Sequence, residues 1–462
     1  MKILRNGRGN LEKIIRKKNV DGMCRLSGFV FLHDNGKKLL AKHTITAEVI
    51  ELTPDEYDLL SELKNGVKPA EQIRSMGLGE LLSKRYIVGE NYVEKDHYND
   101  ILAILRIMRT GKQKGMSKYT ILPTTACNAR CAYCFEYGFV PETMTHETAD
   151  RVVDYIMKTK QDGKIRLEWF GGEPTVARDV ITYICNQLAS KGVEYTSAIV
   201  TNGSLISDEL AEEAVNVWHL KRAQVSVDGR RSDYELRKAY PDKRFTYDVV
   251  MDNIARLADR GVRVSLRCNL DRTNIGGAEE FFDDIYERFG KYENVSIYLA
   301  PLHQEMKLDS ITSLHQSIMD LYDLVEGTPK GKMFNTQISR GGMRYNYCFS
   351  DAMDLAVIIM PDGSFTNCEN LPAGHNWGNV TDGITDKELY EKLKNAVYLD
   401  DKCSACCFLP ECTAARRSVC PVINDRCYEC KVIDTVYELD HLKITGDTAG
   451  GDDDVQIEDD PC

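Results

Sequence analysis

The sequence predicts an α/β protein built on a curved, partly closed barrel of six parallel strands. A winged-helix-like module precedes this barrel, and a cysteine-rich domain follows it. Between residues 106 and 305, six apolar, strand-like runs alternate with helical patterns. Such alternation indicates parallel strands joined by right-handed crossovers. In the first hundred residues, the sequence instead indicates a hairpin, then short helices and a closing strand. Most of the sixteen cysteines lie at 127–134 and after residue 340.

Length and composition favour a folded protein of several domains. The chain has 462 residues, of which 43% are hydrophobic and 28% charged, and a domain usually holds about 100–200 residues. The net charge of −12 argues against a nucleic-acid partner, since such proteins present a basic face. No run approaches the length of a membrane span, and the basic N-terminus lacks the apolar stretch of a secretory signal. We therefore expect a cytoplasmic protein without a membrane partner.

Residues 1–105 are expected to form the winged-helix-like module. Two weakly alternating runs, 28–32 and 37–42, flank the hairpin signal Asn-Gly at 35–36. The sequence Thr-Pro-Asp-Glu at 53–56 is a capping box with proline at the first helical position. The remaining expected elements are helices near 69–76 and 79–84 and a strand at 86–88. The alternative is an extension that only packs on the barrel.

Residues 106–305 are expected to form the barrel, and the remaining residues three further regions. The six expected strands lie at 119–122, 165–170, 196–200, 223–227, 262–270 and 295–299. Active sites in such sheets lie at the carboxyl ends of the strands. The later regions are a helical connector at 306–340, a metal-held domain at 341–440 and an acidic disordered tail at 441–462.

Three cysteines, Cys127, Cys131 and Cys134, follow the first barrel strand as a C-x3-C-x2-C motif. Disulfides are rare in a reducing cytosol, so clustered cysteines favour metal ligation. Three thiolates can hold three irons of a 4Fe–4S cluster and leave the fourth iron open. The motif resembles that of the radical S-adenosylmethionine (radical SAM) superfamily. The resemblance implies oxygen-sensitive catalysis in which an electron donor such as flavodoxin or ferredoxin drives S-adenosylmethionine cleavage to a 5′-deoxyadenosyl radical. A zinc knuckle or three unrelated core cysteines are the alternatives.

Other strand ends resemble the family's contacts to S-adenosylmethionine. The second strand ends in Gly171-Gly172-Glu173-Pro174, where the glycines allow close backbone approach and the glutamate offers an acceptor for the methionine ammonium. The candidates for ribose and carboxylate contacts are Asn202, Ser226, Arg237, Arg267 and Asn269. For the two asparagines, and for Asp228 beside them, a turn or cap role remains open.

A second group of cysteines resembles the SPASM domain, which carries two auxiliary 4Fe–4S clusters in peptide-modifying radical SAM enzymes. The resemblance implies that the first auxiliary cluster is held by Cys348, Cys368 and Cys420, and the second by Cys403, Cys406, Cys412 and Cys430. Cys427 would close the first cluster or leave one iron open. The family's C-x3-C step is an x7 step here, because position 416 is arginine. The alternative is a zinc ribbon that uses the two C-x2-C pairs at 403–406 and 427–430.

The remaining cysteines need no ligand role. Cys407 adjoins a candidate ligand and is expected to be a bystander, whereas Cys24, Cys185 and Cys268 fall on apolar stretches and are expected to be buried thiols.

Together these regions resemble maturases of ribosomally made peptides, whose N-terminal element takes the leader as an added strand on a sheet edge. The resemblance implies a cytoplasmic enzyme with three 4Fe–4S clusters that installs a cross-link, expected to be a Cys thioether, in a precursor peptide with a leader. Three alternatives stay open. They are an anaerobic sulfatase maturase forming formylglycine, a carbon–carbon peptide cyclase or epimerase, and a non-catalytic cluster scaffold or electron carrier.

Overall fold

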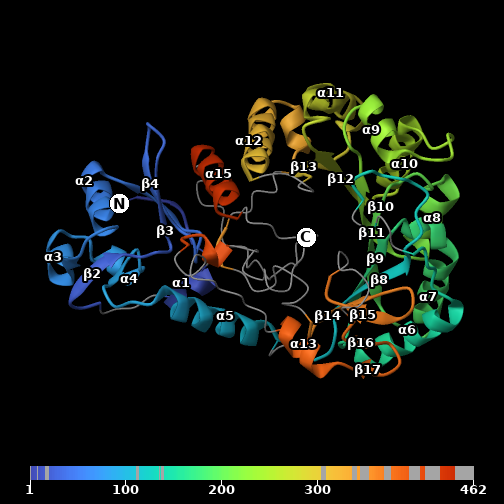
Figure 1. The fold of residues 1–462 in the computed structure, drawn as a ribbon, viewed down its shortest axis with the longest axis horizontal. Coiled ribbons are helices and arrows are strands. Elements are labelled where there is room, and N and C mark those ends of the chain that lie inside the picture. Colours follow the sequence, from blue (N-terminus) through green and yellow to red (C-terminus); the bar gives the residue numbers. More distant parts are fainter. Residues whose placement is uncertain are drawn as a thin grey trace. The chain divides into compact units, whose positions relative to one another are not determined.

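The computed structural model describes residues 2–7, 9–15, 20–110, 114–134, 136, 140–302, 308–335, 341–343, 353–368, 376–394, 406–411 and 427–442. They belong to two units (Figure 1). Unit 1 comprises the described residues of 1–109, 338–348 and 397–462, and unit 2 those of 110–337 and 349–396. Within this part of the chain, none of the helices has the length and apolar character needed to cross a bilayer.

Unit 2 is built on six parallel strands that lie side by side in chain order. They are β8 (Lys118–Thr124), β9 (Ile165–Gly171), β10 (Tyr195–Thr201), β11 (Leu220–Ser226), β12 (Arg263–Leu270) and β13 (Val295–Pro301). Each overlaps one of the six runs in the sequence, so the predicted α/β fold with a parallel sheet is confirmed. β9 alternates strictly, with Ile165, Leu167 and Trp169 buried and the residues between them half-buried.

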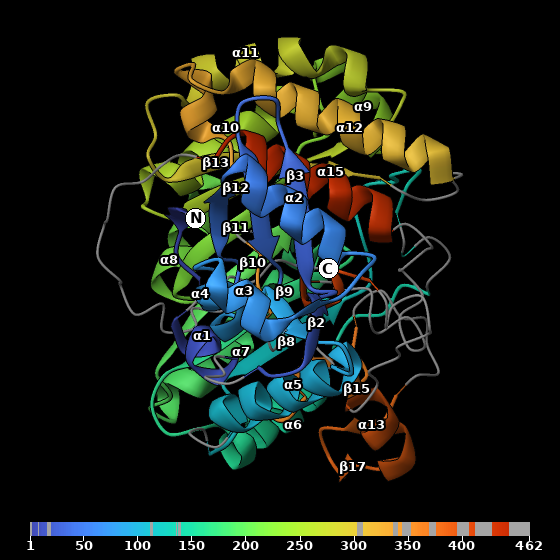
Figure 2. The same ribbon diagram turned by 90° about the vertical axis from the view of Figure 1, so that its left-hand side faces the viewer.

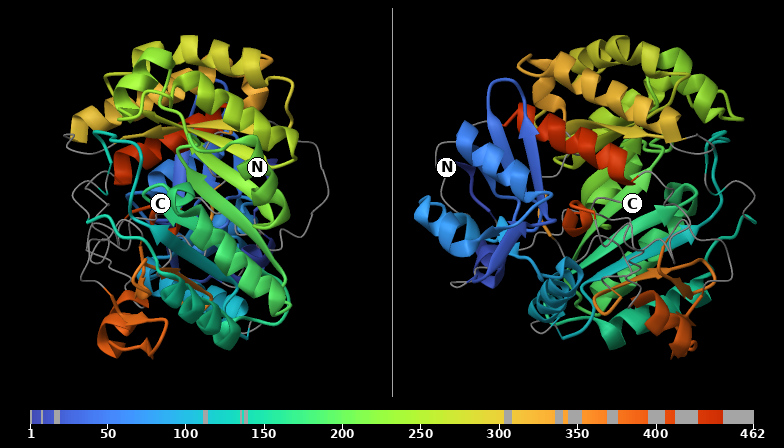
Figure 3. Two further views of the ribbon diagram at one scale, coloured as in Figure 1. Left: turned by 90° about the vertical axis from the view of Figure 1, so that its right-hand side faces the viewer. Right: turned by 60° about the vertical axis from the view of Figure 1, so that its left-hand side comes forward.

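Helices connect these strands and lie along one face of the sheet (Figures 1 and 3). The longer ones are α6 (His146–Thr159), α7 (Arg178–Ser190), α8 (Asp208–Asn216), α9 (Arg231–Lys238), α10 (Tyr247–Asp259), α11 (Ala278–Phe289) and α12 (Leu308–Val325). Short 3-10 turns occur at η1 (Pro174–Ala177), η2 (Ile275–Gly277) and η3 (Lys330–Met333). The helical connector expected at 306–340 corresponds to α12 and η3, and its described residues belong to unit 2.

The described parts of the cysteine-rich region fall in both units, and its expected boundaries stay a prediction. β14 (Ala356–Ile359) pairs in parallel with β8, because its four residues are apolar and become buried there. β15 (Ser364–Thr366), β16 (Gly378–Asn379) and β17 (Gly383–Ile384) continue the same sheet in antiparallel order, followed by α13 (Lys387–Lys394). In contrast, η5 (Leu409–Glu411) and α15 (Cys427–Asp440) belong to unit 1.

Unit 1 contains two antiparallel sheets and five N-terminal helices (Figure 2). The larger sheet has the order β1 (Lys2–Arg5), β5 (Val49–Leu52), β4 (Leu39–His43) and β3 (Val30–Asp34). The smaller has the order β6 (Lys68–Pro69), β2 (Met23–Leu26) and β7 (Ile87–Gly89). The helices are α1 (Gly9–Ile15), α2 (Pro54–Leu63), α3 (Ala70–Ser75), α4 (Gly79–Ser83) and α5 (Glu94–Thr110). The expected hairpin, the three short helices and the closing strand are all present.

The core of unit 1 lies between the larger sheet and helices α2 to α4. Ala41 and Ile50 from the sheet pack with Leu60, Ile73 and Leu81 from the helices, and each is at most 1% exposed. The first turn of α2 is fixed by the expected capping box. The Glu56 amide donates to Thr53 Oγ1 at 3.3 Å, and the Thr53 amide donates to Glu56 Oε2 at 2.9 Å.

We expect Thr53→Ala to destabilise the first turn of α2 by about 1 kcal/mol, because the Glu56 amide loses its acceptor. Native-state hydrogen exchange should show this amide exchanging about fivefold faster. Ser61→Ala, on the last turn of the same helix, is the control and should leave the rate unchanged. Equal exchange in both variants would contradict a stabilising role for the cap.

Candidate active site

The first cysteine motif forms a loop directly after β8. Cys127, Cys131 and Cys134 are half-buried free thiols, and the Cys134 amide donates to the Cys131 carbonyl at 3.1 Å. Burial raises the pKa of the Cys127 thiol to about 12. A thiolate at this position therefore needs neighbouring positive charge, which a bound iron cluster supplies. The donor set and its burial thus fit the cluster that the motif implies.

The Gly-Gly pair at the end of β9 makes direct backbone contact with the start of this loop. The Gly172 amide donates to the Thr124 carbonyl at 3.1 Å, and the Glu173 amide donates to the Ala126 carbonyl at 2.9 Å. Gly171 has a φ of 118°, which side-chain-bearing residues rarely adopt. A Cβ on Gly172 would lie 2.5 Å from the carbonyl oxygens of Thr125 and Ala126. The close approach expected of the glycines is therefore made to the cysteine loop.

The Glu173 carboxylate is fully buried and connects the ends of β9 and β10. It accepts from Thr201 Oγ1 and the Asn202 amide, both at 2.7 Å, and from the Thr175 amide at 3.1 Å. Burial raises the pKa of this carboxyl despite these donors. A carboxylate has about four acceptor positions, so protein donors already occupy most of them. Its expected contact with a ligand ammonium stays a prediction. Pro174 is buried at the start of η1.

Asn202 joins the end of β10 to the cysteine loop. Its side-chain amide donates to Asn128 Oδ1 at 2.8 Å and lies 3.9 Å from Cys127 Sγ. Asn128 in turn donates to Ser204 Oγ at 2.8 Å. Because Asn202 is only 8% exposed, these contacts hold its side chain within hydrogen-bonding reach of a candidate iron ligand.

Asp228 is the centre of a buried polar cluster after β11. Its carboxylate accepts from Asn269 Nδ2 at 2.8 Å, and lies 3.2 Å from the Lys238 ammonium. It also accepts from the Tyr133 hydroxyl, and Lys238 donates to this hydroxyl at 3.0 Å. Asp228 and Lys238 are at most 3% exposed. The cluster therefore connects the ends of β11 and β12 to the loop that carries the cysteines.

Sequence reasoning missed Tyr133 and Lys238. The position of Tyr133 between Cys131 and Cys134 was a usable signal, whereas no motif marks Lys238. Burial lowers the pKa of Lys238, but Asp228 and, to a smaller extent, Tyr133 and other neighbours more than offset this, so the pKa lies well above its usual value. Lys238 is therefore a permanent positive charge close to the cysteine loop.

Arg237, on α9, has buried N–H donors that lack acceptors among the described residues. Its Nη1 donates to Asp271 Oδ2 at 2.8 Å and to Thr273 Oγ1 at 3.0 Å, and its guanidinium carbon lies 5.1 Å from the Tyr133 ring centre. Its Nε and Nη2 are buried, and neither finds an acceptor among the described residues. Guanidinium donors in this state suit a carboxylate. Whether Arg237 makes one of the ribose or carboxylate contacts implied by the resemblance stays a prediction.

The other candidates lie at the same edge of the sheet. Arg267 donates through Nε to Asn269 Oδ1 at 2.9 Å. Ser226, the last residue of β11, is half-buried and pairs in register with Arg267. The structure therefore brings the cysteine loop and all the predicted S-adenosylmethionine contacts to the carboxyl ends of β8 to β12.

The second group of cysteines is only partly described. Cys348, Cys403, Cys412 and Cys420 lie outside the described residues, and Cys427 and Cys430 are placed only as part of α15. Cys368 is half-buried in unit 2, and Cys406 and Cys407 are half-buried in unit 1. The ligand sets of the auxiliary clusters stay predictions. Cys24, Cys185 and Cys268 are fully buried, which confirms that expectation.

We expect Gly172→Ala to remove most 5′-deoxyadenosine formation, because the new Cβ would overlap two carbonyl oxygens at the start of the cysteine loop. Iron content and 5′-deoxyadenosine yield after anaerobic reconstitution measure the effect. Gly276→Ala is the matched control, since a Cβ there meets nothing within 4 Å. Full activity of Gly172→Ala would show that this backbone contact is not needed.

Comparison with known proteins supports the same chemistry. Residues 121–285 match the model of the radical SAM superfamily. GTP 3′,8-cyclase of Clostridium perfringens (strain SM101 / Type A) is 24% identical over 331 residues, covering 66% of this chain and 92% of that protein. Fe-coproporphyrin III synthase of Methanosarcina barkeri (strain Fusaro / DSM 804) is 26% identical over 168 residues, covering 36% and 39%.

Among solved structures, anSMEcpe with bound AdoMet has a TM-score of 0.56 at 15% identity, covering 70% of this chain and 94% of that chain. This likeness shows a shared fold. Streptococcus suis SuiB bound to the precursor peptide SuiA has a TM-score of 0.49 at 15% identity, covering 84% and 94%. Because residues 121–285 match the radical SAM model, the chain contains a radical SAM domain. Enzymes with this domain use S-adenosylmethionine and a 4Fe–4S cluster.

Proposed function

We propose that this chain is a radical SAM maturase that installs a cross-link, expected to be a Cys thioether, in a ribosomally made precursor peptide. The main support is the N-terminal module of unit 1, which lies outside the residues that match the radical SAM model. The module has a buried hydrophobic cluster of its own, formed by residues between Cys24 and Ile87, which favours a separate domain over an extension that only packs on the barrel.

The module offers sheet edges to an extended leader peptide. Among the described strands, β1 and β3 are the edges of the larger sheet, and β6 and β7 are the edges of the smaller one. An edge strand presents unpaired backbone groups, and peptides often bind by adding a strand to such an edge. In this proposal the leader is held by the module, and the core peptide is presented to the radical SAM domain.

The residues at the strand ends have separate tasks in this proposal. Cys127, Cys131 and Cys134 would hold the radical SAM cluster, and Arg237 would bind the methionine carboxylate. When bound, the cluster and S-adenosylmethionine supply a 5′-deoxyadenosyl radical that removes a hydrogen atom from the substrate. Asn202 and the Asp228 cluster contact the cysteine loop and would help to fix its arrangement.

Thioether formation needs an electron acceptor as well as a radical. The peptide loses one hydrogen atom from carbon and one proton and one electron from the thiol as the C–S bond forms. The second group of cysteines would hold the auxiliary clusters that accept this electron. Of the expected ligands, Cys368, Cys406 and Cys430 lie in the described part. One of the structures that shares the fold, anSMEcpe, was solved with bound AdoMet and Cp18Cys peptide, which supports a peptide as substrate.

A second candidate function follows from the sequence matches. GTP 3′,8-cyclase aligns with two thirds of this chain, which favours a nucleotide substrate such as GTP. About a third of the chain lies outside this alignment. The N-terminal module lies outside the residues that match the radical SAM model, and a peptide leader would give it a role that a small nucleotide substrate would not.

Coexpression with the short Cys-containing peptides encoded by neighbouring reading frames tests the proposal. The expected product has lost two hydrogens and one alkylatable thiol, and S-adenosylmethionine is converted to 5′-deoxyadenosine. The variant in which Cys127, Cys131 and Cys134 are all alanine is the control and should give neither product.

Other outcomes would indicate other reactions. Loss of two hydrogens with all thiols retained would indicate a carbon–carbon link. Formylglycine, or deuterium incorporation from D2O at an α-carbon, would indicate the other peptide alternatives. GTP consumption without any change in a peptide would favour the second candidate.

We expect Arg237→Lys to weaken S-adenosylmethionine binding by about 10- to 100-fold, because charge-assisted hydrogen bonds contribute about 1.5–3 kcal/mol. Calorimetry on the anaerobically reconstituted enzyme measures the dissociation constant. Arg256→Lys is the control, because Arg256 pairs with the exposed Asp208 on the helical layer. An unchanged constant in Arg237→Lys would exclude a contact between this guanidinium and the ligand.

A further inference from the structure

We infer that the N-terminal module has a second task besides peptide recognition. Through Lys42, the module positions the segments 406–411 and 341–343, and the auxiliary cluster predicted to use Cys406 depends on the charge balance at this contact. The inference rests on the proposed function for the role of Cys406 as an iron ligand. Lys42 would then be a positioning residue for the cluster.

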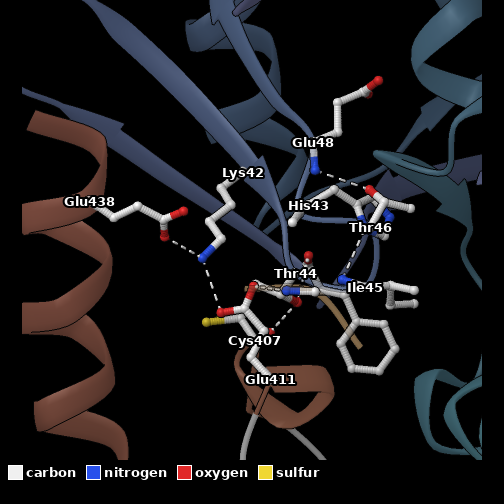
Figure 4. A network of polar contacts seen from close by, with 12 residues as sticks. Lys42, His43, Thr44, Ile45, Thr46, Glu48, Cys407, Glu411 and Glu438 are labelled. Atoms are coloured by element: carbon white, nitrogen blue, oxygen red, sulfur yellow. Dashed lines mark hydrogen bonds and ion pairs between the residues drawn. The ribbon is translucent and has the colours of Figure 1, made fainter. Parts of the chain in front are cut away.

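Lys42 joins three segments that are far apart in the sequence (Figure 4). It lies on β4 and is 1% exposed. Its Nζ lies 3.0 Å from Glu411 Oε2 and 2.8 Å from Glu438 Oε2. Glu411 directly precedes the predicted ligand Cys412, and Glu438 lies on α15, which begins at Cys427. One buried ammonium therefore contacts both the segment that carries Cys406 and the helix that carries Cys427 and Cys430.

The charged side chains around Lys42 balance one another. Arg5, on β1, forms an ion pair with Glu438 through its Nη1, so two cations meet two carboxylates. The side chain of Glu411 is 4% exposed. Loss of Lys42 would leave the Glu411 carboxylate buried without a cation, which is strongly unfavourable because a buried charge needs a partner. The segment before Cys412 would then have to move toward water.

The residues after Lys42 hold the same segments by hydrogen bonds. Thr44 Oγ1 donates to the Cys407 carbonyl at 2.6 Å, and the Met343 amide donates to the Ile45 carbonyl at 2.6 Å. The Gly342 amide donates to Glu411 Oε1 at 2.8 Å. Segments 341–343 and 406–411, which are close in sequence to the predicted ligands Cys348, Cys403 and Cys412, are therefore hydrogen-bonded to the module.

Lys84 provides a comparison within unit 1, because it is a second buried lysine of the same module. Lys84 is also buried and lies 2.6 Å from Glu48, which belongs to the module. Both carboxylates that contact Lys42 come instead from the C-terminal part of the chain. The two lysines thus have similar burial and different partners. Of the two, Lys42 is the one that connects the module to a cysteine-bearing segment.

The test compares Lys42→Met with Lys84→Met in the full-length chain. Both are made in the variant with alanine at Cys127, Cys131 and Cys134, so that the remaining iron belongs to auxiliary clusters. We expect Lys42→Met to retain about half or less of the auxiliary iron, because metal binding is coupled to folding of its ligand segment. Lys84→Met should retain the iron of its parent. Iron and sulfide analysis and the electron paramagnetic resonance of the reduced clusters are the readouts.

A double variant separates loss of charge balance from general unfolding. Lys42→Met combined with Glu411→Gln leaves the Arg5–Glu438 pair intact and no uncompensated carboxylate, so we expect its iron content to recover. Equal iron in Lys42→Met and Lys84→Met would overturn the inference. Failure of the double variant to recover would also overturn it.

Cys406→Ala distinguishes failure of this inference from failure of the proposed function. If the parent holds auxiliary iron that Cys406→Ala loses and Lys42→Met keeps, only the inference fails. If the parent holds no auxiliary iron, or Cys406→Ala changes nothing, the auxiliary-cluster part of the proposed function fails and the inference fails with it.

Discussion

The parallel register of β8 to β12 is the constraint on which the candidate site depends. Parallel strands end at one edge of a sheet, so the segments that follow them converge although they span more than a hundred residues of sequence. The two glycines after β9 then allow its backbone to contact the cysteine loop directly. A shift of one strand by one residue would reverse which side chains face the helices and would separate these contacts.

Local signals account for the parts of the fold that the sequence predicted. The six strands, the hairpin around residues 35–36 and the capping box at Thr53 each depend on neighbouring residues, and all are present in the structure. The need for glycine at 171 and 172 was also predictable, although the contacting backbone was not. The burial of Glu173 was not predictable, because its donors Thr201 and Asn202 lie 28 and 29 residues away on the next strand end.

The described parts of the cysteine-rich region fall in both units, and the sequence did not indicate this division. Residues 356–359 are a short apolar run, which periodicity alone could not assign to the edge of β8. Lys42 sits in a strand that the sequence places in a hairpin, where a lysine normally faces water. Its partners are 369 and 396 residues away. No local pattern indicates such a pair, and so unit 1 could not be assembled from the sequence.

Arg237 differs from the other candidate cofactor contacts in a way that bears on how the site binds its ligand. Glu173, Asn202, Asp228 and Asn269 direct their polar atoms to other protein groups, and these contacts fix the cysteine loop. In the described part of this site, the buried donors without acceptors are those of Arg237. Because the surrounding residues are already hydrogen-bonded to one another, Arg237 can bind a carboxylate while their hydrogen bonds stay in place. Such preorganisation lowers the entropic cost of holding the ligand in one orientation. The sequence could place Arg237 after the fourth strand, but only the structure shows that it has buried donors without acceptors among the described residues.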